Sequence, residues 1–134
     1  MIDKRGFTLI ELMLVVIIIG VLVSMVAPRL VGRSEEARIA AAKADIEANI
    51  SVALDLYELD NGSYPDDLAG LIVKLDSAAS WKGPYLKKTP RDPWGNAYAY
   101  RLPGRHGMDY DLYSYGPDKT DGGEDDITNW EEKQ

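Results

Sequence analysis

The feature that most constrains this chain is a long apolar run near its N-terminus that contains one acidic residue. Residues 12–27 carry no charge, and the apolar pattern begins at Phe7. About 21 residues of helix, at ~1.5 Å per residue, span the ~30 Å hydrocarbon core of a bilayer. The sequence therefore predicts a membrane-spanning helix over residues 7–27. Glu11 lies inside it, and because an ionised carboxylate is costly within a bilayer, such a residue indicates a functional partner.

A cleaved secretory signal is the alternative interpretation of this run, since Lys4 and Arg5 precede it. Two features oppose that interpretation. Glu11 interrupts the apolar segment, and the small-residue site near Ala27 is followed by Pro28, which is unfavourable after a signal-peptidase cut. A retained membrane helix is therefore the favoured interpretation.

The rest of the chain is acidic and contains no cysteine. The formal net charge of the chain is −7 at pH 7. Roughly 107 residues lie outside the apolar run, which is enough for one small domain. An acidic chain without a basic stripe does not suit nucleic acid, so we exclude that partner. Because no disulfide can form, the domain must be stabilised by packing, by a metal or by assembly.

The helix is expected to continue beyond the apolar run with a weak point. Pro28 lacks an N–H donor and Gly32 adds a second soft position, so a kink or local melting is predicted across residues 26–34. Ser34 could cap a helix that restarts there. Residues 39–57 then carry apolar side chains three, four or seven positions apart, which form one stripe.

The end of this helix is also marked in the sequence. Asp60-Asn61-Gly62 is a stop signal in which Gly62 is a suitable left-handed cap. The pattern therefore predicts one long helix from about Phe7 to Asp60, apolar all round at first and amphipathic later.

A short helix and a small sheet are predicted downstream. Residues 66–76 have the spacing of a helix capped by Asp66 or Asp67. Residues 94–96 indicate a turn, residues 97–102 a strand, residues 103–107 a loop, and residues 110–115 the last strand. The predicted sheet has two to four antiparallel strands and packs on the amphipathic helix. Its core and surface account for most of the aromatic side chains: Tyr64, Tyr85, Trp94, Tyr98, Tyr100, Tyr113 and Trp130.

No arrangement of catalytic residues is found in the sequence. His106 lies alone in a loop, with no second imidazole or cysteine to complete a metal site or a triad. The chain has no G-x-S-x-G motif, no P-loop and no spaced pair of carboxylates for acid–base catalysis. We therefore expect a protein that is not an enzyme.

A loop rich in carboxylates lies near the C-terminus. Residues 118–126 contain five acidic residues around two glycines. The spacing excludes an EF-hand, whose acids fall at fixed positions before a glycine and end in a glutamate. The residues alone leave two interpretations open: a solvated charge run, or a site for a cation that would relieve the mutual repulsion.

The N-terminal motif resembles that of a known superfamily. Gly6-Phe7-Thr8-Leu9-Ile10-Glu11 after a short basic leader resembles the class III signal peptide of type IV pilins and pseudopilins, and Pro28 also matches. In that superfamily a prepilin peptidase cuts after the glycine on the cytoplasmic side and methylates the new N-terminal phenylalanine. The resemblance implies cleavage after Gly6 and N-methylation of Phe7.

The same resemblance implies a domain organisation and a fold. Residues 1–6 would be the leader, residues 7–27 the membrane and filament-core helix, and residues 28–134 a periplasmic pilin-like domain. Within that domain the amphipathic helix would end at about residue 60, residues 66–84 would form a variable segment, and residues 85–130 the sheet and the acidic loop. The fold class is α+β, with the long helix packed on a small antiparallel sheet.

Cleavage would give Glu11 a partner. By itself Glu11 could be an interfacial residue whose side chain extends out of the bilayer. A new amine at Phe7, one helical turn away, favours another role, because a carboxylate buried among filament helices requires a cation. We expect Glu11 to pair with the Phe7 amine of its own or a neighbouring subunit and so to guide assembly.

The remainder of the chain resembles one branch of that superfamily, the G-type major pseudopilins of type II secretion systems. The residues that carry this resemblance are 54–65, 85–88, 92–96, 111–118 and 125–130. Three departures are a shorter segment over residues 67–84, Lys119 where a glycine is common, and Thr128 in place of another glycine.

The G-type resemblance also implies Ca²⁺ in the acidic loop. Its side-chain ligands would be Asp118, Asp125 and Asp126, and Tyr115 would contribute a carbonyl oxygen. A further carbonyl would come from Thr120 or Gly123. The cation would then clamp the last loop onto the sheet, as a disulfide does in many type IV pilins.

The function implied is that of a self-assembling structural protein. The chain would be inserted in the inner membrane and extracted into a periplasmic helical filament that drives folded proteins toward an outer-membrane secretin. Its expected partners are other copies of itself, minor pseudopilins, prepilin peptidase, and the inner-membrane assembly platform with its ATPase. Two alternatives remain open: a subunit of a surface type IV pilus used in adhesion, motility or DNA uptake, and a monomeric membrane-anchored binding module.

Overall fold

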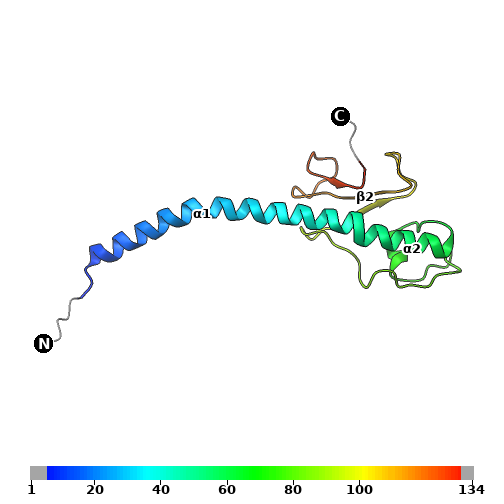
Figure 1. The fold of residues 1–134 in the computed structure, drawn as a ribbon, viewed down its shortest axis with the longest axis horizontal. Helices are drawn as coiled ribbons and strands as arrows, with labels where there is room; N and C mark the ends of the chain where they lie inside the picture. The colour runs from blue at the N-terminus through cyan, green and yellow to red at the C-terminus, as the bar shows by residue number, and fades with distance from the viewer. Residues whose placement is uncertain (1–5, 131–134) are drawn as a thin grey trace. The chain divides into compact units, whose positions relative to one another are not determined.

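The computed structural model describes residues 6–130, which divide into two compact units after Glu36. The first unit contains the apolar part of helix α1, which runs from Leu9 to Ala44 (Figure 1). The leader residues 1–5 lie outside the described residues. The sequence analysis placed a boundary earlier, after the apolar run, and the two divisions differ by about nine residues.

The backbone of α1 is continuous across residues 26–34, which confirms the predicted long helix. The restart that Ser34 could have capped does not occur. A proline removes only one hydrogen bond of the helical ladder, and helix-forming residues on both sides preserve the others. The Pro28 side chain lies outside the described side chains. Melting of this segment within a filament stays a prediction.

The long helix contains a wider turn that the sequence analysis did not predict. After α1, the π-helix η1 runs from Asp45 to Ile50, and α2 follows from Ser51 to Asn61. Gly62 ends α2 with a left-handed backbone (φ 81°), which confirms the predicted cap. The helical segment therefore covers nearly the predicted length.

The wider turn has a physical reason in the spacing of the core residues. The most buried positions of the helix include Ala42, Ile46, Ile50 and Leu54, which are four residues apart. In an ideal α-helix a four-residue step rotates by about 40° past a full turn, so such a row drifts around the helix. The i→i+5 hydrogen bonds of η1 widen one turn and keep the row facing the core.

The predicted helix over residues 66–76 is reduced to a single 3-10 turn, η2, from Leu68 to Leu71. Its predicted cap is confirmed, because the Asp67 carboxylate accepts the amide of Ala69 at 2.8 Å. The helix does not continue because the Leu71 carbonyl accepts the amides of Tyr85 (2.7 Å) and Leu86 (3.0 Å) instead of one in its own segment. The contact with a distant loop therefore takes the place of the helical ladder.

Three short antiparallel strands form the sheet in the order β1-β2-β3. They are β1 from Ala99 to Arg101, β2 from Asp111 to Ser114, and β3 from Ile127 to Thr128. The first two confirm predicted strands, whereas β3 was missed, because two residues are too few to show an alternating pattern. Ser114 pairs with Ile127, so the two ends of the acidic loop lie side by side.

A buried aspartate organises the turn that was predicted before β1. Asp92 accepts the amides of Trp94 (3.1 Å) and Asn96 (2.8 Å), and Gly95 adopts a positive φ of 90°. The second oxygen of Asp92 accepts the hydroxyl of Ser114 in β2 at 2.7 Å. The turn is thus confirmed and is attached to the central strand.

The core lies between the helix and the sheet, where tyrosines contact helical carboxylates. The core combines helical residues with Tyr98, Tyr110, Leu112 and Ile127. The Tyr98 hydroxyl donates to Asp45 at 2.8 Å. Most of the aromatic side chains predicted for the core belong to it or pack against it, and these are Tyr64, Tyr85, Trp94, Tyr98 and Tyr100.

Alkaline pH is expected to unfold this domain. Burial, followed by the negative charges of Asp55, Asp109 and Glu58, raises the pKa of Tyr110 to about 12, and burial and Asp45 raise the pKa of Tyr98 further. A raised folded-state pKa contributes stability that is complete below the unfolded value, near 10, and is lost as pH rises through the folded value. Tyrosinate absorbance and far-UV circular dichroism, recorded on the full chain in detergent, should therefore change together above pH ~10. Titration of all tyrosines at their ordinary pKa with an unchanged fold would contradict this expectation.

Candidate functional site

The first candidate site is the start of the apolar helix. Gly6, Phe7 and Thr8 precede the helix, and the Phe7 side chain is 86% exposed. Leu9–Val26 has a mean hydropathy of 3.0, is long and apolar enough to cross a membrane, and has none of its residues buried. The bond between Gly6 and Phe7 therefore lies in exposed, non-helical backbone.

Glu11 caps the helix in which it lies. The backbone amide and the hydroxyl of Thr8 donate to its carboxylate at 2.7 and 3.0 Å, and the Glu11 amide donates to the Thr8 hydroxyl at 3.3 Å. This reciprocal arrangement is a capping box, and it starts the helix at Leu9. The sequence analysis missed this role, although the pattern Thr-x-x-Glu over residues 8–11 is the signal for it.

The second candidate site is the acidic loop between β2 and β3. Asp118, Asp125 and Asp126 each offer a carboxylate oxygen, and these oxygens lie within 4.8 Å of one another. The structure thus brings together the three side chains that were predicted as ligands. Asp121 and Glu124, which were left out of the prediction, are not in this group.

Two glycines allow the loop to close this tightly. A Cβ atom on Gly116, which has a φ of 69°, would lie 2.2 Å from the carbonyl oxygen of Asp125. A Cβ atom on Gly123 would lie 2.4 Å from an Asp125 carboxylate oxygen and 2.9 Å from one of Asp118. A side chain at Gly123 would displace these two carboxylates, and a side chain at Gly116 would displace the backbone of Asp125.

The three carboxylates differ in their hydrogen bonds. The amide and hydroxyl of Thr120 donate to Asp118 at 2.9 and 2.7 Å and hold the pKa of Asp118 below its usual value. Asp126 accepts the Gly122 amide at 3.0 Å with one oxygen, whereas its Oδ1 atom is buried and has no hydrogen-bond partner among the described residues. Burial, with the charges of Asp121, Asp125 and Asp118, raises the pKa of Asp126 despite the Gly122 amide.

These properties fit a hard cation. Ca²⁺ binds six to eight oxygens from carboxylates and carbonyls, and a bound cation neutralises the repulsion between neighbouring carboxylates. The buried oxygen of Asp126, which has no hydrogen-bond partner among the described residues, suits such a ligand position. The carbonyl ligands expected from Tyr115 and from Thr120 or Gly123 stay predictions.

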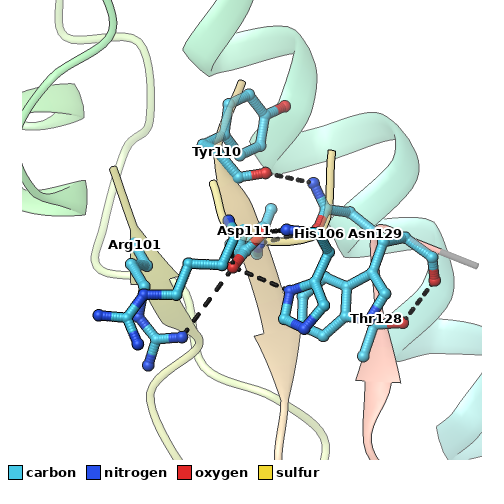
Figure 2. A network of polar contacts seen from close by, with 9 residues as sticks. Arg101, His106, Tyr110, Asp111, Thr128 and Asn129 are labelled. Carbon is cyan, nitrogen blue, oxygen red and sulfur yellow. Dashed lines mark hydrogen bonds and ion pairs between the residues drawn. The ribbon is translucent and has the colours of Figure 1, made fainter. Parts of the chain in front are cut away.

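A polar network lies beside this loop and was not found by sequence analysis (Figure 2). The carboxylate of Asp111, which has no exposed surface, accepts the amides of Arg105 (3.0 Å) and His106 (3.4 Å) and lies 3.0 Å from Nδ1 of His106. Burial opposes ionisation of Asp111, but these donors outweigh it and lower its pKa. His106, expected to stand alone, also stacks on Trp130 with ring centroids 3.9 Å apart. Its partners are 5 and 24 positions away in the sequence, so no local signal could identify them.

Both candidate sites lie in parts of the chain that match known family models. Residues 29–130 match the family described as type II secretion system (T2SS), protein G, and residues 1–27 match the prokaryotic N-terminal methylation motif. The type II secretion system core protein G of Pseudomonas aeruginosa is 48% identical over 139 residues, covering 96% of each chain. The core protein G of Escherichia coli (strain K12) is 49% identical over 134 residues, covering 95% of this chain and 91% of that one.

A solved structure agrees with these matches. The crystal structure of the major pseudopilin from the type 2 secretion system of enterohaemorrhagic Escherichia coli is similar, with a TM-score of 0.67 and 34% identity. The similarity covers 75% of this chain and 89% of that chain. With the predicted α+β fold in place, and with matches over nearly the whole sequence, the chain belongs to the protein G family of type II secretion systems.

Proposed function

We propose that this chain is the major structural subunit of a type II secretion pseudopilus, which polymerises through its N-terminal helix to drive protein export through the outer membrane. The observation that carries the proposal is the helical segment Leu9–Val26, none of which is buried against the residues that the structure describes. Such a surface requires lipid or the helices of neighbouring subunits. Family membership favours the second environment as the functional one.

Processing would convert the precursor into an assembly-competent subunit. We expect prepilin peptidase to cut after Gly6 and to methylate Phe7, and the match to the N-terminal methylation motif supports this. The exposed, non-helical backbone at Gly6–Phe7 suits a peptidase, which binds extended substrates. The new amine at Phe7 would then compete with Thr8 for the Glu11 carboxylate.

The chain would span the inner membrane once, with its N-terminus in the cytoplasm and its globular domain in the periplasm. Its partners would be further copies of itself in a helical filament, minor pseudopilins, the inner-membrane assembly platform with its ATPase, and indirectly the secretin. The acidic globular domain suits the outer, solvated surface of such a filament.

Calcium would belong to this function as a structural ion. Asp118, Asp125 and Asp126 would hold it, with a carbonyl from Tyr115 and another from Thr120 or Gly123. When bound, Ca²⁺ neutralises the mutual repulsion of the carboxylates. Gly116 and Gly123 allow the loop to fold closely enough to bring these carboxylates together.

The alternatives are less well supported. A surface type IV pilus subunit would share the N-terminal motif, but the matched relatives are named as secretion system proteins along almost the full chain. A monomeric anchored binding module would not need the processing motif at residues 1–27. We therefore retain the secretion pseudopilus.

Deletion of the gene tests this function directly. We expect the deletion strain to retain exoproteins in the periplasm while surface motility is unchanged, because export depends on the filament. Expression of the full chain should restore secretion, which is measured by comparing exoproteins in the culture medium and in periplasmic extracts. Normal secretion with loss of twitching would assign the chain to a surface pilus instead.

A further inference from the structure

The position of the acidic loop depends on β3, a strand with too few residues to be stable through its own pairing. Strand β3 consists of Ile127 and Thr128 and forms only two register pairs with β2. It begins directly after Asp126, so a displacement of β3 would change the positions of Asp125 and Asp126 relative to Asp118. Three neighbouring carboxylates repel one another, and without a cation that repulsion acts to open the loop.

Thr128 at the end of β3 and the two residues after it supply further anchoring for the strand. The side chain of Asn129 bridges two backbone positions of the neighbouring segment, accepting the Leu112 amide at 2.9 Å and donating to the Tyr110 carbonyl at 3.0 Å. The Thr128 hydroxyl donates to the Trp130 carbonyl at 2.7 Å. Figure 2 shows the bond between Asn129 and Tyr110 and the one that Thr128 donates. The Trp130 ring stacks on the imidazole of His106.

His106 in turn is fixed by a buried charge. Its imidazole lies 3.0 Å from Asp111, which also accepts two backbone amides of the same loop and lies 4.0 Å from the Arg101 guanidinium. The Trp130 ring lies flat on this imidazole, with an angle of 3° between the planes, and packs edge-on against Tyr113 of β2. We call Asp111, His106 and Trp130 the clamp.

We propose that the clamp positions the acidic loop. It holds β3 in register with β2 and so brings the three carboxylates together before the ion binds. The consequence of this positioning is a higher affinity of the loop for its cation. A pre-organised site spends less of the binding energy on ordering the loop, so the clamp increases the affinity for Ca²⁺. This inference rests on the proposed calcium site and assigns His106 and Trp130 as positioning residues, because neither is expected to contact the ion.

The test compares two tryptophans. Trp130→Ala removes the stack on His106, whereas Trp81→Ala removes a half-buried tryptophan that donates to the Gly70 carbonyl at 2.9 Å, away from the clamp. Ca²⁺ affinity is measured by calorimetry on the full chain in detergent, well below the melting temperature in chelator. The Ca²⁺ affinity of Trp130→Ala should fall about threefold to tenfold, which is the change that the interaction free energy of one aromatic pair produces. The Ca²⁺ affinity of Trp81→Ala should be unchanged.

Two further variants keep the inference testable if Trp130→Ala does not fold. His106→Gln keeps a polar group near Asp111 but removes the ring on which Trp130 stacks. It should weaken Ca²⁺ binding, as Trp130→Ala does. Trp130→Phe keeps an aromatic ring and should recover most of the affinity. An unchanged affinity in His106→Gln and Trp130→Ala, or an equal loss in Trp81→Ala, would overturn the inference. Absence of Ca²⁺ binding by the unaltered chain would instead overturn the calcium site itself.

Discussion

A Glu11→Val variant is expected to insert in the membrane and to fold, yet to form few or no filaments. In a filament the Glu11 carboxylate would be surrounded by apolar helices, and its partner would be the amine of Phe7. Loss of one partner from a buried ion pair costs about 3–5 kcal/mol, because the other charge is left without compensation. Electron microscopy of sheared filaments and assay of exported protein measure the outcome.

The capping box makes a second variant necessary. Valine removes both the charge and the hydrogen bonds that Glu11 makes with Thr8, so a loss of assembly could have either cause. Glutamine also serves at this position of a capping box, so Glu11→Gln removes the charge while the helix start is retained. We expect Glu11→Gln to assemble as poorly as Glu11→Val. Normal filaments and secretion from either variant would refute the pairing with Phe7.

Removal of calcium is expected to produce the second large effect, a lower melting temperature of the globular domain. An ion that binds only the folded state stabilises it by about 2.7 kcal/mol when the free ion concentration is about 100 times its Kd. For a domain of about 100 residues this corresponds to a shift on the order of 10 °C. Circular dichroism of the full chain in detergent, with chelator and then with added Ca²⁺, measures the shift.

Asp126→Asn makes this expectation more specific. Burial and the neighbouring carboxylates raise the pKa of Asp126, so without a cation its charge opposes folding. In chelator the Asp126→Asn variant should therefore melt at the same temperature as the unaltered chain or above it, whereas added Ca²⁺ should no longer stabilise it.

The control for this variant is an acidic residue of the same loop. Glu124→Gln changes an exposed carboxylate outside the group of three and should leave the calcium response intact. A melting temperature of the unaltered chain that does not respond to chelator would refute the calcium site.

The parts of the site that the sequence predicts are those with local signals. Five carboxylates lie within residues 118–126 around two glycines, so a tight acidic loop could be expected from the residues alone. The choice of Asp118, Asp125 and Asp126 among them came from the family resemblance, and the structure brings these three together. The capping box at residues 8–11 is also local and could have been found from its spacing. By contrast, His106 gains its role from Asp111 and Trp130, contacts that only the folded chain creates.

The sequence by itself determined the apolar helix, the stripe of the amphipathic helix, the stop at Gly62 and two of the strands, because each depends on residues that are close in the chain. The tertiary structure alone decided the π turn, which aligns a four-residue row of core side chains, and the reduction of residues 66–76 to one turn, since distant amides bind the Leu71 carbonyl. It also decided β3, whose two residues are ordered by pairing and by the Asn129 side chain. In each case a contact across the chain outweighs a local preference, and local preferences are weak compared with burial and a satisfied hydrogen bond.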